Sequence, residues 1–148
     1  MASGFIILRD GRCLSVRHAI HDSVLLSIAA AIEDDNLRAW LTTQVPADGD
    51  IDIGYAFVRA GSGEHVSREL DTRGFTESNR RSIELAVAEA EPIAGPRARL
   101  EDVAFALKRL REMVRLCDEG RPPLELSDWT IEAPPCEERI GPGWMEST

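Results

Sequence analysis

The sequence predicts an α+β domain in which two β-hairpins form one four-stranded antiparallel sheet, packed against helices and followed by an extended acidic C-terminal tail. The chain has 148 residues, which suits one domain with its own core. Two segments alternate apolar and polar residues around glycine turns, and four segments repeat apolar residues at helical spacing. We expect the domain to span residues 1–120 and the tail residues 121–148.

The first hairpin is predicted at the N-terminus. Gly4–Arg9 and Arg12–Arg17 are short runs rich in β-forming residues, with Asp10 and Gly11 between them. Asp-Gly is a strong hairpin signal because glycine adopts the positive φ that a tight turn requires.

Two helices are predicted after this hairpin. Apolar residues recur every three or four positions from Ala19 to about Glu33. A second, shorter helix carries Leu37, Trp40 and Leu41, and Pro46 stops it. The segment 34–36 supplies its N-cap, because short oxygen-bearing side chains accept hydrogen bonds from the free amides of a helix start.

The second hairpin follows an acidic turn, residues 47–52. Ile53–Ala60 and Glu64–Leu70 are the predicted strands, and 61–63 is the turn between them. A helix is then expected from Glu77 to about Glu91, with Thr76 as its N-cap.

The longest helix is predicted at Arg99–Glu119, where apolar residues follow spacings of three and four and Gly120 provides the stop. Phe105, Met113 and Leu116 lie off its main apolar stripe, so either a homodimer contact or the tail could cover them. The tail itself is rich in proline and holds at most one short strand, at Leu126–Ile131.

The two hairpins also resemble each other at an offset of 50 residues, since residues 4–11 and 54–61 match in type. A ββα pseudo-repeat over 4–43 and 51–91 is one explanation, and chance similarity between two ordinary hairpins is the other.

Charge and cysteine content favour a cytoplasmic protein that binds other proteins. Seventeen basic and 26 acidic residues give a net charge of −9, which disfavours nucleic acid and anionic lipid and favours basic partners. No apolar run is long enough for a membrane span or a signal peptide. The three cysteines lie far apart, which is typical of reduced thiols in the cytoplasm.

The predicted partner-binding residues lie in the acidic turn and the tail: Asp48, Asp50, Asp52, Trp129 and Trp144. Exposed tryptophans flanked by carboxylates suit a protein interface, in which aromatic side chains anchor and charged side chains select the partner. The alternative for Trp129 is that it packs back on the sheet as part of an added edge strand.

Cys13, His18, His21 and Asp22 form a cluster of metal-ligand type, at the end of a strand and the start of a helix. No second pair at metal spacing accompanies them, so we predict neither a metal nor a cofactor, and ordinary histidines are the expected interpretation.

These observations favour a small acidic bacterial-type protein that acts by protein–protein binding, as an immunity protein, an inhibitor or an adaptor. The residues single out no catalytic set, so binding is favoured over catalysis. The alternative is a homo-oligomeric small-ligand or metal-binding domain, with or without enzymatic activity, that uses the His18/His21 region.

Overall fold

The computed structural model of the chain describes residues 3–121 and 138–140. The predicted α+β class is confirmed, because four α-helices pack with two small sheets. The predicted arrangement of the strands is not, as the two sheets show.

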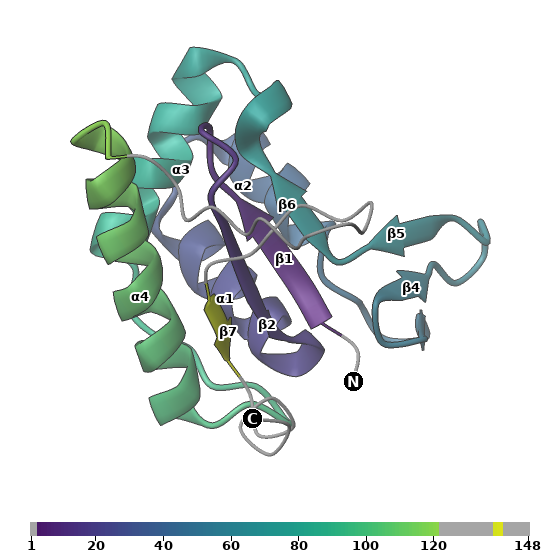
Figure 1. The fold of residues 1–148 in the computed structure, drawn as a ribbon. Coiled ribbons are helices and arrows are strands. Elements are labelled where there is room, and N and C mark those ends of the chain that lie inside the picture. The colour runs from purple at the N-terminus through teal and green to yellow at the C-terminus, as the bar shows by residue number, and fades with distance from the viewer. Residues whose placement is uncertain (1–2, 122–137, 141–148) are drawn as a thin grey trace, which may run out of the picture.

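The first sheet holds the N-terminal hairpin. β1 (Ser3–Ile7) and β2 (Cys13–Arg17) pair antiparallel, in the register that places Ser3 opposite Arg17. Gly11 has a φ of 91° in the turn between them, as the Asp-Gly signal predicted. β6 (Glu69–Asp71) pairs parallel with β1, and β7 (Glu138–Ile140) pairs parallel with β2, giving the order β6-β1-β2-β7 (Figure 1).

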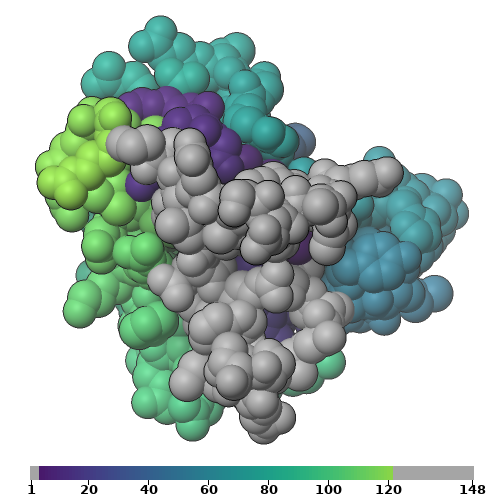
Figure 2. Space-filling model, in the orientation of Figure 1, coloured from purple at the N-terminus to yellow at the C-terminus, as the bar shows by residue number. Residues whose placement is uncertain are grey.

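The second sheet consists of β3 (Ile51–Asp52), β4 (Ala56–Val58) and β5 (His65–Ser67), all antiparallel. It projects from the side of the molecule, to the right in Figure 2. The prediction of one antiparallel sheet built from both hairpins is therefore wrong. The chain bends at Arg68, between β5 and β6, and leaves the second sheet to join the first.

The helices begin and end close to where the sequence predicted. They are α1 (His18–Ala31), α2 (Asp35–Thr42), α3 (Glu77–Glu89) and α4 (Leu100–Asp118). The side chains of Asp34 and Thr76 accept hydrogen bonds from backbone amides of the first turns of α2 and α3. A short 3₁₀ turn, Thr72–Gly74, connects β6 to α3.

One apolar core lies between the first sheet and the helices. α1 is its centre: it packs on β1 and β2 and also against α2, α3 and α4, and most of its side chains are buried. A helix that is apolar on nearly all sides is stable only in such a central position.

The structure describes two of the three cysteines, and one of them differs from the prediction of reduced thiols. Cys13 is disulfide-bonded, whereas Cys117 is a buried free thiol. Spacing along the chain does not reveal which thiols come within bonding distance in the fold. The cytoplasmic location stays a prediction.

In the part of the chain that the structure describes, none of the helices combines the length and apolar character that a membrane span requires. The predicted strand at Leu126–Ile131 lies outside the described residues.

Candidate functional site

Two parts of the structure bear on function: the acidic turn that the sequence singled out, and a groove between α2 and α3 that it did not. In the acidic turn, Asp48 is exposed. Asp50 accepts hydrogen bonds from the backbone amides of Ala47 at 2.8 Å and Ala60 at 2.9 Å. These bonds lower the pKa of Asp50 and give its carboxylate a structural task, which is to hold the turn against the end of the second hairpin.

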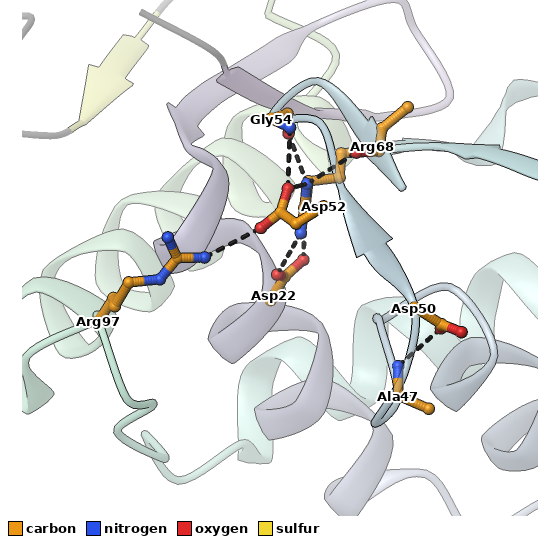
Figure 3. Close-up of polar contacts among 8 residues, drawn as sticks. Asp22, Ala47, Asp50, Asp52, Gly54, Arg68 and Arg97 are labelled. Atoms are coloured by element: carbon orange, nitrogen blue, oxygen red, sulfur yellow. Dashed lines mark hydrogen bonds and ion pairs between the residues drawn. The ribbon is translucent and has the colours of Figure 1, made fainter. Parts of the chain in front are cut away.

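Asp52 also serves the fold, through a buried arginine (Figure 3). One oxygen of Asp52 accepts a hydrogen bond from Nη1 of Arg68 at 2.8 Å. The other accepts one from Nη2 of Arg97 at 2.9 Å. The side chain of Arg68 is fully buried, whereas that of Arg97 is 64% exposed. Solvent therefore screens the Asp52–Arg97 ion pair more strongly than the Asp52–Arg68 pair.

Arg68 joins the second sheet to α1. Its Nε and Nη2 atoms donate to the two carboxylate oxygens of Asp22 in α1, at 2.9 and 2.8 Å. Its Nη1 atom also donates to the carbonyl oxygens of Gly54 at 2.5 Å and Ala56 at 3.2 Å, on either side of the turn into β4. The guanidinium carbon lies 5.7 Å from the centre of the buried Phe57 ring.

The pKa values of the two carboxylates around Arg68 shift in opposite directions. Partial burial favours a higher pKa for Asp52, but hydrogen bonds from Arg68 and the Gly54 amide outweigh it and lower the pKa to about 2. Asp22 is more deeply buried, and there burial outweighs the Arg68 hydrogen bonds and raises the pKa. Arg68 thus links the second sheet to α1, and the stabilisation from this link depends on both carboxylates being ionised.

His21, from the predicted histidine cluster, lies close to Arg68. His21 is completely buried, and burial together with the nearby charge of Arg68 lowers its pKa to about 3. Neither of its ring nitrogens has a hydrogen-bond partner. The ring packs on Gly4, where an added Cβ would lie 2.3 Å from the His21 Cγ atom. Among the described residues, no group of three or more His, Cys, Asp or Glu side chains is placed to hold a metal ion.

The α2–α3 groove is an open surface that a partner can reach. It has a larger and a smaller hollow. The larger hollow, of about 420 Å³, is lined by Asp34, Asn36, Leu37, Trp40, Phe75 and Asn79. The smaller, of about 140 Å³, is lined by Ala31, Glu33, Asp34, Ser82, Leu85, Ala86 and Glu89. Asp34 belongs to both, so the hollows are adjacent.

The larger hollow contains an accessible aromatic pair. The rings of Trp40 and Phe75 meet edge to face, with centroids 5.5 Å apart. Trp40 is 42% exposed although Leu37 and Leu41 of the same helix are buried. The amide side chains of Asn36 and Asn79, from the first turns of α2 and α3, stand beside the pair. An aromatic surface with nearby amide groups is suited to anchoring a partner's side chain.

The charge along the groove is acidic and largely uncompensated. None of the described residues that line the two hollows is basic. Glu33 and Glu89 are exposed, and neither forms an ion pair within the described residues. This distinguishes them from Asp50 and Asp52, whose oxygens bond to groups of the chain itself.

Of the five predicted partner-binding residues, Asp48 and Asp50 lie in the turn before β3, Asp52 lies in β3 and bonds to Arg68 and Arg97, and Trp129 and Trp144 lie outside the described residues. Sequence reasoning missed Arg68 and the Trp40–Phe75 pair. A signal for Arg68 was present, because alternation along the strand puts it on the same side as the buried Val66 and Leu70. A charged residue in that position indicates a buried ion pair.

Comparisons of the chain with protein-family models, with curated proteins and with solved structures found no match.

Proposed function

We propose that the protein acts by binding another protein, and that this partner is basic. The observation that carries the proposal is the exposed Trp40–Phe75 pair in the larger hollow, next to a smaller hollow lined by Glu33 and Glu89, which form no ion pair within the described residues. Tryptophan is enriched among the residues that dominate binding energy, and surrounding charges govern the association rate and the choice of partner. The net charge of −9 acts in the same direction.

An immunity protein, an inhibitor or an adaptor of bacterial type fits this chemistry. Each of these works by forming a stable complex, and a basic partner meets an acidic surface with favourable long-range electrostatics. Asp48, Trp129 and Trp144 remain proposed contacts for the partner. Asp50 and Asp52 are less suitable contacts, since their carboxylates already bond within the fold.

The test is affinity capture of the tagged full-length chain from its native lysate at low salt, followed by mass spectrometry. We expect one basic protein in stoichiometric amount, released as the salt concentration rises. Asp48→Lys, Trp129→Ala and Trp144→Ala variants report which proposed contacts matter, with Tyr55→Ala as the control, because Tyr55 is an exposed aromatic residue outside the proposed contacts. Capture of no protein, or of an acidic one, would refute the proposal.

A second candidate function is a ligand or metal site at His18 and His21. The observation that favours it is the pair of imidazoles without hydrogen-bond partners: Nδ1 of His18 and both nitrogens of His21 are buried and unpaired. The low pKa of His21 keeps its ring neutral at physiological pH, the form that binds metals. Untagged protein would then carry stoichiometric metal that a His18→Ala/His21→Ala variant lacks, and fully folded, metal-free protein would exclude the metal site.

A further inference from the structure

The α2–α3 groove has the length, shape and charge to take one helix of the partner. This inference rests on the proposed function and goes beyond it, because it names the surface and the kind of segment that binds there. The groove follows one stripe of α3, formed by Asn79, Ser82, Ala86 and Glu89. Ten residue steps along a helix correspond to about 15 Å, or nearly three turns.

The opposite wall is the chain from the end of α1 into α2. Ala31, Glu33 and Asp34 face the middle of α3 across the smaller hollow, and Trp40 lies over the larger one. The floor is apolar: Leu37 and Ala86 are buried, while Leu85 is 62% exposed at the rim. An apolar floor between two walls suits the insertion of side chains from an amphipathic helix.

The two hollows set the spacing of the inserted side chains. Asn79 marks the larger hollow and Ala86 the smaller, and the seven steps between them correspond to about 10 Å along α3. On a partner helix lying along the groove, residues i and i+7 have this separation. The hollow of about 420 Å³ accepts a large apolar or aromatic side chain, and that of about 140 Å³ accepts a smaller one.

The charge of the groove indicates which other residues the partner helix carries. Glu33, Asp34 and Glu89 line the smaller hollow, and the nearby Arg38 is already bonded to Asp35 and to the carbonyl oxygen of Ile32. The hollow on the other side of α3, which shares Leu85 with the smaller hollow, is different, since Arg9, Arg80 and Arg81 line it together with three acidic residues. Of these two described sides of α3, the α2–α3 side offers the less compensated negative charge to a basic segment.

We propose that this groove binds a basic amphipathic helix of the partner protein, with apolar side chains at i and i+7 in its two hollows and lysine or arginine beside Glu33 and Glu89. The probe is a synthetic peptide of about 18 residues, long enough to form helix in isolation. It carries leucines on one face, including i and i+7, and lysines and arginines elsewhere. One comparison peptide has the leucines redistributed around the helix, and another has glutamates in place of the basic residues.

Binding is measured by NMR titration of the full-length, isotope-labelled chain. We expect the leucine-faced basic peptide to shift the Trp40 indole signal and the side-chain amide signals of Asn36 and Asn79, and the comparison peptides to bind at least about tenfold more weakly. Trp40→Ala should weaken binding by about tenfold or more, as for a central anchor residue. Glu89→Lys should weaken it most at low salt. Arg81→Ala, on the other side of α3, serves as the control and should leave the affinity unchanged.

The possible failures can be told apart. Equal binding of the redistributed peptide, shifts outside the groove, or an unchanged affinity in Trp40→Ala would overturn the groove inference. Absence of peptide binding, with a basic protein still captured by the full chain, would overturn the helical segment and leave the proposed function standing. Capture of no basic protein, in contrast, would remove the proposed function itself.

Discussion

Replacement of Arg68 by methionine is the sharpest test of how the second sheet is held. The substitution keeps an unbranched side chain but removes five hydrogen bonds, two to Asp22, one to Asp52 and two to backbone carbonyls. It leaves the Asp22 carboxylate, whose side chain is only 18% exposed, without its cation. It also removes the contact of the guanidinium with the ring of Phe57.

The expected loss of stability is large. Breaking a buried ion pair by removing one partner costs about 3–5 kcal/mol, because the other charge stays buried and uncompensated. Small domains unfold with free energies of about 5–15 kcal/mol, so the variant should lose about a fifth of its stability or more. Arg97→Met is the matched control, since it removes an exposed cation from the same Asp52 and should cost about 0–1 kcal/mol.

Urea denaturation followed by far-UV circular dichroism measures both free energies of unfolding. If Arg68→Met does not fold, Arg68→Lys keeps the charge while losing the planar, forked geometry, and it should fall between the wild type and the methionine variant. A loss of about 1 kcal/mol or less for Arg68→Met, equal to that of Arg97→Met, would refute the role given to Arg68.

Three further substitutions test other parts of the account by the same denaturation assay. Gly4→Ala should lower the free energy of unfolding by more than about 3 kcal/mol, because the new Cβ would lie 2.3 Å from a ring atom of His21. Gly74→Ala, whose new Cβ meets nothing within 4 Å, should be nearly neutral, and similar values for the two variants would contradict the packing described. His21 stays neutral in the fold down to about pH 3 but is protonated near pH 6.5 when unfolded, so the unfolded state binds more protons and stability falls as the pH drops through this range. His21→Leu should remove this contribution, which is at most about 3 kcal/mol between pH 7 and pH 4, and an unchanged difference in stability between these two pH values would show that the ring does not titrate in this way. Asp50→Ala should lower the free energy of unfolding by about 1 kcal/mol, because two backbone amides lose their acceptor. Asp48→Ala, at an exposed site, should leave it almost unchanged, and the reverse order would refute the structural role of Asp50.

The local elements could be predicted from the sequence because their signals are local. Asp10 and Gly11 predicted the first turn, Asp34 and Thr76 the starts of two helices, and Gly120 the end of the last one, where its φ is 72°. Each depends on side chains or backbone freedom within a few residues.

The assembly of the strands could not be predicted in the same way. Alternation indicates that 64–70 is a strand but does not say which strands lie beside it, and β6 pairs parallel with β1, more than 60 residues away in the chain. The bend at Arg68 then divides one predicted strand between two sheets. The α2–α3 groove could not be predicted for the same reason. Its Trp40–Phe75 pair forms only because α2 and the segment before α3 come together in the fold.

The most direct test of the central claim, that this protein binds a basic partner through the α2–α3 groove, is site-specific photo-crosslinking in cells. A photoreactive amino acid replaces Asn79, which is exposed in the larger hollow, or Tyr55, which is 61% exposed beside the second sheet. The account predicts one basic protein attached through position 79 and absent at position 55. An acidic adduct at position 79, equal labelling from both positions, or no adduct at position 79 would contradict it.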